Sequence, residues 1–166
     1  ATGVSLRRDV LAMEDAGAID TGIFTDFGVV TTTADNGPQL TRALLTQLAA
    51  TKPDVIVFEL GDGLLGAYGV EAILTDEAIV SALTATVLCA NDPVAAWGGV
   101  HLLRERFGIE PAAVTGRATD NLVGVEMIHD QLGVPAANAL TSQAELAGIV
   151  MARLRGESAA EEESDE

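Results

Sequence analysis

The chain has 166 residues, a formal net charge of −16 at pH 7 and a hydrophobic content close to half. This length fits one domain with a sizeable core. The acidic balance argues against nucleic-acid binding, which needs clustered lysine and arginine, and against binding to an anionic membrane surface.

No signal peptide is visible, and no apolar run reaches the ~18 residues that a membrane span needs. We therefore expect a cytoplasmic protein with no membrane partner, and a small molecule as its ligand.

The first third of the chain predicts a polar segment, a strand and a helix. Residues 1–18, ATGVSLRRDVLAMEDAGA, are either an ordinary solvated helix or a segment whose Arg7, Arg8 and Asp9 contact a substrate or phosphate. Residues 22–30 predict a short strand, because β-branched and aromatic residues surround Asp26. Residues 37–51 predict a helix, because leucines recur at helical spacing and Pro38 suits its first turn.

The middle of the chain predicts two buried strands around a helix. Residues 54–60, DVIVFEL, have the apolar run of a strand that is buried on both faces of a parallel sheet. Residues 75–83 predict a helix with Thr75 as its N-cap. Residues 85–90, ATVLCA, predict the next buried strand.

The remaining elements continue the alternation of strand and helix: helix 93–108, strand 111–116, helix 121–133, strand 136–140 and helix 142–156. This order predicts an α/β fold with three layers, in which helices cover both faces of a mostly parallel sheet. We expect a single domain over residues 1–156 and a disordered acidic tail over residues 157–166.

Ligands of such sheets bind beyond the carboxyl ends of the strands. Polar or flexible residues follow each predicted strand, among them Asp26, Glu59, Asn91, Gly116 and Thr119. We expect these residues to converge on one edge of the sheet.

Glu59 is the strongest single candidate. A carboxylate at the end of a buried strand is costly unless it is paired or binds a metal. It is expected either to hold Mg²⁺ or to pair with an arginine or cap a helix. Asp62, between Gly61 and Gly63, is either a nucleotide or metal contact or a turn-former.

Two further groups have both a structural and a functional interpretation. Asn91 either precedes a helix as part of its cap or contacts the base or ribose of a nucleotide. Gly116 and Thr119 lie before a predicted helix N-terminus, which either binds an anion or is simply capped. No GxxxxGK[ST] motif occurs in the sequence.

Three segments in this order, ATGVSLRRDVLAMEDAGA, FTDFGVVTT and PDVIVFELGDGLL, resemble the dethiobiotin synthetase-like branch of the P-loop nucleotide-binding proteins. The resemblance covers most of residues 1–150. It implies an enzyme that uses ATP and Mg²⁺ and is usually dimeric.

The resemblance also implies roles for individual residues. Thr2 and Asp9 correspond to the substrate-side or metal-side residues, and Glu59 corresponds to the acid associated with Mg²⁺. Gly61 and Gly63 correspond to the glycine turn of the family.

The sequence departs from the family because the first strand, the Walker A loop and its helix are absent. One interpretation is the carboxyl-terminal part of an ATP-dependent ligase or ATPase, whose P-loop comes from another segment or chain. The other is a non-catalytic α/β module that binds a small ligand or a partner protein.

Overall fold

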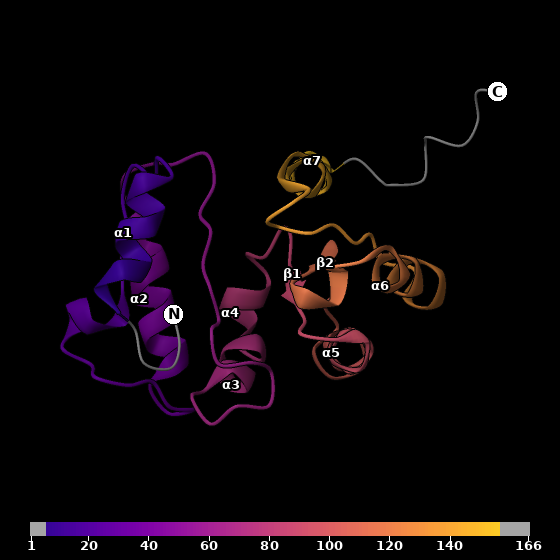
Figure 1. Ribbon diagram of the computed structural model, residues 1–166. Helices are drawn as coiled ribbons and strands as arrows, with labels where there is room; N and C mark the ends of the chain where they lie inside the picture. The colour runs from indigo at the N-terminus through magenta and orange to yellow at the C-terminus, as the bar shows by residue number, and fades with distance from the viewer. Residues whose placement is uncertain (1–5, 157–166) are drawn as a thin grey trace. The chain divides into compact units, whose positions relative to one another are not determined.

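The computed structural model describes residues 6–156, and the chain divides into two compact units, Ala1–Ala82 and Leu83–Glu166. It is an α/β-like fold, about half helical, with a two-stranded parallel sheet among the described residues (Figure 1). Whether the two units make one domain over residues 1–156 stays a prediction, as does a larger three-layer sheet. The predicted tail, residues 157–166, lies outside the described residues.

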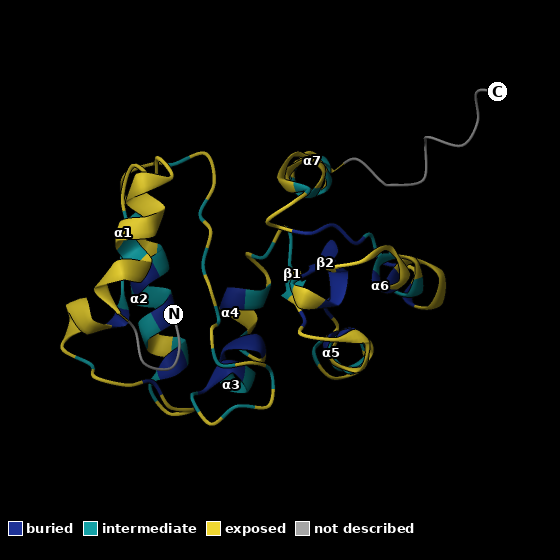
Figure 2. Cartoon of the chain, in the orientation of Figure 1, coloured by how far each residue is buried: buried dark blue, intermediate teal, exposed yellow. Residues whose placement is uncertain are grey.

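The first unit is built from short helices. They are α1 (Arg7–Asp15), the 3-10 helix η1 (Phe24–Phe27), α2 (Gly37–Ala49), α3 (Val70–Leu74) and α4 (Glu77–Val80). Its core includes Phe24, Leu44, Val70, Ile73 and Ile79, each under a tenth exposed. α1 contributes no buried residue, and Figure 2 shows it exposed along most of its length.

The helix predicted over residues 37–51 is confirmed as α2, with Pro38 in its first turn. The helix predicted over 75–83 forms only in part. Thr75 ends α3, and Asp76 caps α4 by accepting a hydrogen bond from the Ile79 amide at 3.2 Å. The Arg42 guanidinium pairs with the Asp76 carboxylate and ties α2 to the start of α4.

The strand predicted over residues 22–30 is wrong. Asp26 accepts a hydrogen bond from the Ile23 amide at 3.0 Å, and Gly28 has a φ of 73°. This local capping competes with a strand and closes one turn of 3-10 helix instead.

The strand predicted over residues 54–60 is also wrong in this structure. After α2 the chain turns at Lys52, whose φ is 54°, and then runs without regular secondary structure to Gly61 (Figure 1). No backbone hydrogen bond within the described chain joins residues 54–58 to another segment. Its burial on both faces is contradicted as well, because the Val57 side chain is 76% exposed.

The second unit contains the parallel sheet. Strands β1 (Val87–Cys89) and β2 (Ala113–Thr115) pair in parallel, with Val87 opposite Ala113. These are shorter forms of the strands predicted over 85–90 and 111–116. The strand predicted over 136–140 is reduced to a single parallel bridge between Val114 and Ala136.

Helices surround this sheet in the predicted order: α5 (Pro93–Phe107), the 3-10 turn η2 (Arg117–Thr119), α6 (Leu122–Met127), the π-helical turn η3 (Ile128–Leu132) and α7 (Gln143–Leu154). Gly108 and Gly133 both adopt the left-handed conformation that ends a helix. The core gathers Ala96, Val100, Val114, Ile128 and Val134 between α5, β2 and η3.

Arg104 fixes the end of α5 to η3. Its guanidinium donates to the Leu132 carbonyl at 2.9 Å and to both carboxylate oxygens of Glu110. The hydrogen bond from Arg104 lowers the pKa of Glu110 below its usual range and raises the pKa of Arg104. This pair serves the packing of the second unit.

Candidate functional site

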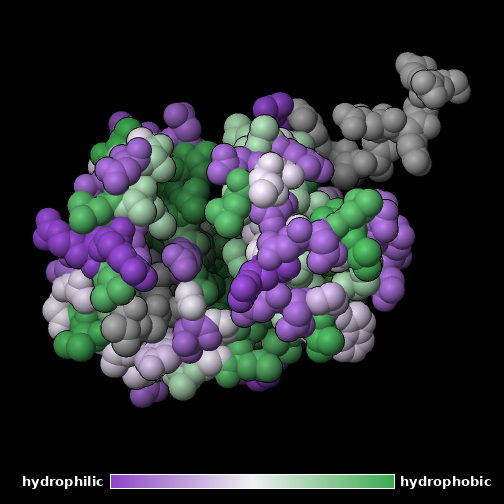
Figure 3. All heavy atoms as spheres, viewed as in Figure 1, coloured by the Kyte–Doolittle hydropathy of each residue, from purple (hydrophilic) through white to green (hydrophobic). Residues whose placement is uncertain are grey.

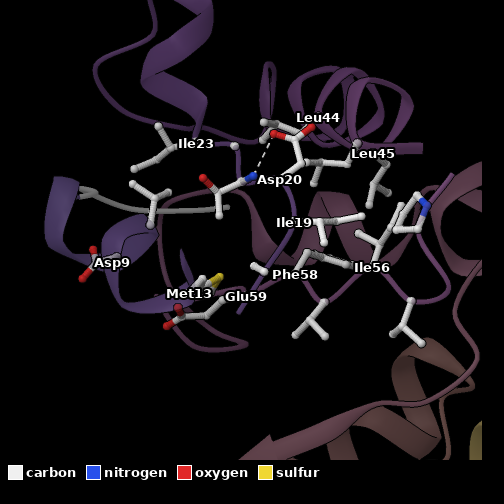
Figure 4. A pocket seen from close by; sticks show the side chains of 18 of the residues that line it. Asp9, Met13, Ile19, Asp20, Ile23, Leu44, Leu45, Ile56, Phe58 and Glu59 are labelled. Carbon is white, nitrogen blue, oxygen red and sulfur yellow. Dashed lines mark hydrogen bonds between the residues drawn. The ribbon is translucent and has the colours of Figure 1, made fainter. Parts of the chain in front are cut away.

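A pocket of about 670 Å³ lies within the first unit. α2 forms the floor, and α1, residues 16–24 and residues 53–62 form the walls (Figure 4). In Figure 3, apolar side chains surround the hollow beside α1 and α2. The described lining residues are Asp9, Val10, Met13, Ala16, Gly17, Ala18, Ile19, Asp20, Thr21, Gly22, Ile23, Phe24, Thr41, Leu44, Leu45, Leu48, Thr51, Pro53, Val55, Ile56, Val57, Phe58, Glu59, Gly61 and Asp62.

The floor of the pocket follows from the helical repeat of α2. Thr41, Leu44, Leu45 and Leu48 lie three or four positions apart and therefore share one face. Gly22 crosses this face closely, since a Cβ atom at Gly22 would lie 3.0 Å from the Leu44 side chain. The segment before η1 is thereby held against α2.

Four carboxylates line this largely apolar pocket: Asp9, Asp20, Glu59 and Asp62. The described lining contains no lysine, arginine or histidine. A pocket with this balance attracts cations and repels free phosphate groups.

Asp9 and Asp20 have structural partners close to them in the sequence. The Asp9 carboxylate accepts from the Leu6 amide at 3.0 Å and thus caps α1, and it forms an ion pair with the Arg8 Nε at 3.6 Å, while Asp20 accepts from the Thr21 amide at 2.9 Å. The structural interpretation of Asp9 therefore holds, and it leaves room for a second role, because Asp9 is also one of the residues that line the pocket.

Glu59 departs from its predicted environment. The side chain is exposed, whereas the sequence predicts a carboxylate at the end of a buried strand. The reason is that residues 54–58 have no partner strand in the described chain to bury them. The cost of burying a charge therefore gives no argument for a metal at Glu59.

The described acids do not form a complete set of metal ligands by themselves. No group of three or more histidine, cysteine, aspartate or glutamate side chains in residues 6–156 is close enough to hold a metal ion. Mg²⁺ commonly uses one or two protein carboxylates and takes its other ligands from water and substrate phosphates. A metal at Asp9 and Glu59 would therefore have to take its remaining ligands from water and a bound phosphate.

Only part of the glycine turn, residues 61–63, lines the pocket. Gly61 and Asp62 line the pocket, while Gly63 does not and has a φ of 75°. The Asp62 carboxylate folds over Gly66, where an added Cβ atom would lie 2.0 Å from the Asp62 oxygen. These contacts support the turn-forming interpretation of Asp62 and Gly63.

Three predicted site residues belong to the second unit: Asn91, Gly116 and Thr119. They follow the carboxyl ends of β1 and β2, as the sequence predicts. Asn91 is exposed, and Asp92 is the residue that caps α5, by accepting from the Ala95 amide at 2.8 Å. The Thr119 hydroxyl donates to the Gly116 carbonyl at 2.7 Å.

The structure explains why position 116 is a glycine. Its φ is 93°, and a Cβ atom there would lie 2.6 Å from the Ala90 carbonyl oxygen. The close approach lets the Ala118 amide donate to the same Ala90 oxygen at 3.0 Å. Nucleotide contacts from Asn91, Gly116 and Thr119 stay predictions, as does their convergence with Glu59. Thr2 lies outside the described residues.

The sequence interpretation missed three residues that shape these regions. Asp20 and Thr41 line the pocket, and Thr41 could have been found from its place on the leucine face of α2. Asn138, 7% exposed, donates to Asp120 at 3.0 Å and accepts from the amides of Leu140 and Thr141. No short-range sequence signal distinguishes Asn138 from a surface asparagine.

Comparisons with protein-family models, with curated proteins and with solved structures find no match to this chain. Within residues 6–156, no helix combines the length and the apolar character that a membrane span requires.

Proposed function

We propose that this chain carries the magnesium side of an ATP-dependent site of the dethiobiotin synthetase-like kind, as part of a ligase or ATPase that acts on a small metabolite. The observation that supports the proposal is that Asp9 on α1 lines the same pocket as Glu59, Gly61 and Asp62, which lie in or just before a turn far along the sequence. The three-layer parallel sheet of the P-loop proteins belongs to the same proposal.

Asp9 and Glu59 are the residues that would hold Mg²⁺. Both residues line the pocket and are labelled in Figure 4. Bound Mg²⁺ would neutralise the negative charge of the nucleotide phosphates. Without the metal, four carboxylates would repel ATP, so nucleotide binding at this pocket should require Mg²⁺.

The phosphate-binding groups are proposed to come from a P-loop-bearing segment of the same protein or of a second chain. The sequence has no GxxxxGK[ST] motif, and the described pocket lining supplies no cationic side chain. The 166-residue chain should therefore bind Mg·ATP weakly, in the millimolar range, and should not hydrolyse it.

Thermal unfolding of the 166-residue chain tests this proposal. With 10 mM Mg·ATP and a Kd of about 1 mM, binding should stabilise the folded state by about 1.4 kcal/mol, and the unfolding midpoint should rise. ATP with EDTA, and Mg²⁺ alone, should leave the midpoint unchanged. The Asp9→Asn and Glu59→Gln variants should lose the rise.

The chain offers matched controls for both variants. Asp15 lies on α1, and Asp54 precedes the apolar run 55–58, and neither lines the pocket. Asp15→Asn and Asp54→Asn should keep the Mg·ATP-dependent rise. A rise that survives in Glu59→Gln, or no rise in the parent chain, would refute the proposal.

The apolar lining favours a second candidate, a non-catalytic module that binds a small apolar molecule. A volume of about 670 Å³ is within the range of small-ligand sites, and α2 contributes three leucines to it. Such a ligand would bind equally well in Mg²⁺ and in EDTA, and Asp9→Asn would not weaken it.

A further inference from the structure

The backbone of residues 54–58 is available for pairing. Figure 1 shows this stretch as an extended trace between two turns, and its five amides and five carbonyls make no backbone hydrogen bond to the rest of the described chain. Apolar runs in this state are typical acceptors of an added strand, because pairing satisfies their backbone groups.

The side chains of this stretch alternate as those of a strand do. Ile56 and Phe58 are half-buried, while Val55 and Val57 are 46% and 76% exposed, and all four line the pocket. A period of two in burial is the pattern of a strand with one face packed, and Figure 1 shows the stretch extended. Binding a partner strand would therefore cost little reordering of residues 54–58.

The space beside the stretch is apolar on its floor and acidic at its rim. The pocket runs along residues 55–59 and is bounded by the leucine face of α2. Asp9, Asp20, Glu59 and Asp62 bring negative charge to it, and the described lining has no positive side chain. A second copy of this chain would bring a second acidic rim, which like charges disfavour.

We propose that residues 54–58 accept one extended, apolar strand of a partner polypeptide, and that this strand carries a lysine or arginine at the end that meets the acidic rim. Main-chain hydrogen bonds give the affinity, and the alternate side chains of the partner enter the pocket above α2. The inference does not depend on the nucleotide site, because it rests on backbone pairing and on charge.

Hydrogen exchange of the 166-residue chain, read by mass spectrometry in EDTA and without nucleotide, tests this inference. The probes are two capped peptides, Lys-Thr-Val-Ile-Val-Thr and Thr-Val-Ile-Val-Thr-Lys, because the direction of pairing is open. One of them should slow exchange of the amides of residues 54–58 by about tenfold or more. Replacing its lysine by glutamate should weaken binding at least several-fold.

Two controls separate strand pairing from simple filling of an apolar pocket. A peptide N-methylated at alternate residues keeps its side chains but loses its donors on one edge, so one of the two methylation patterns should abolish protection. In the protein, consecutive residues direct their amides to opposite edges, so only one of Ile56→Pro and Val57→Pro should abolish binding. Circular dichroism should show the same helical content in both variants.

Three results would overturn the inference. Equal binding of all N-methylated peptides would mean that the pocket takes apolar groups without pairing. Protection that grows with the concentration of the chain alone would identify a second copy as the occupant. No protection by either lysine peptide, with the fold intact, would show that the stretch accepts no partner strand. None of these results depends on Mg·ATP, so failure here is distinct from failure of the proposed function.

Discussion

Thr41 is the residue whose chemistry fits its surroundings least. Its side chain is 1% exposed on the leucine face of α2, and its hydroxyl has no hydrogen-bond partner among the described residues. A buried hydroxyl without a partner costs roughly 1–3 kcal/mol, because it has lost its hydrogen bonds to water. Thr32 is equally buried, but its hydroxyl donates to the Tyr68 carbonyl at 2.8 Å.

Replacing these two threonines by valine should therefore have opposite effects on stability. Thr41→Val removes the unsatisfied hydroxyl at nearly constant volume and should raise the free energy of unfolding by about 1 kcal/mol. Thr32→Val breaks a buried hydrogen bond and should lower it by about 1 kcal/mol. Urea unfolding of both variants measures the difference. A loss of stability in Thr41→Val would show that the hydroxyl has a partner after all.

At the scale of elements, the sequence predicts helices better than strands in this chain. α2 and α5 form where the leucine spacing, Pro38 and Gly108 indicate, because a helix satisfies its own backbone and is capped by nearby residues. Residues 54–60 have a strand-like composition, yet they form no strand here. A strand depends on a partner that its own sequence does not specify.

The candidate site also combines residues that the local sequence indicates with residues that only tertiary packing brings in. Asp9 and Glu59, which the sequence already singles out as candidates, line one pocket, whereas Thr41 and Asp20 enter it through packing that no motif encodes. Glu59 is the clearest example of what the sequence does not predict. Its place after the apolar run is read directly from the sequence, but its exposure depends on whether a neighbouring strand is present.

Gly116 joins the sheet to η2, and its replacement tests how the second unit is built. Gly116→Ala places a Cβ atom 2.6 Å from the Ala90 carbonyl oxygen and forces a φ of 93° on a residue with a side chain. The strain should lower the free energy of unfolding by about 2–3 kcal/mol.

Gly98→Ala is the matched control for Gly116→Ala. Gly98 lies inside α5, and a Cβ atom there meets nothing within 4 Å. Alanine should stabilise the helix at this position by up to about 1 kcal/mol. If chemical denaturation finds both variants equally stable, the close contact between Gly116 and Ala90 is not a determinant of the fold.

At the scale of the whole molecule, charge is the dominant feature. A net charge of −16 on 166 residues opposes compaction, because like charges are brought closer on folding. Salt screens this repulsion. Raising KCl from about 0.05 M to about 1 M at pH 7 should raise the unfolding midpoint by several degrees, which corresponds to roughly 1 kcal/mol.

The same salt titration near pH 4.2, close to the calculated isoelectric point, is the internal control. There the net charge is small, so the salt-dependent rise measured by calorimetry should largely disappear. An equal rise at both pH values would mean that the salt acts through the exclusion of co-solute from apolar surface and not through charge.

The unpaired stretch 54–58 also has a consequence for how the chain avoids aggregation. Four apolar residues, Val55 to Phe58, form the type of short β-prone segment that seeds intermolecular stacking. Lys52, Pro53 and Asp54 precede this segment and Glu59 follows it, so both of its ends carry the gatekeeper residues that block such stacking. The segment can thus remain open to a specific partner while its flanks discourage indiscriminate ones.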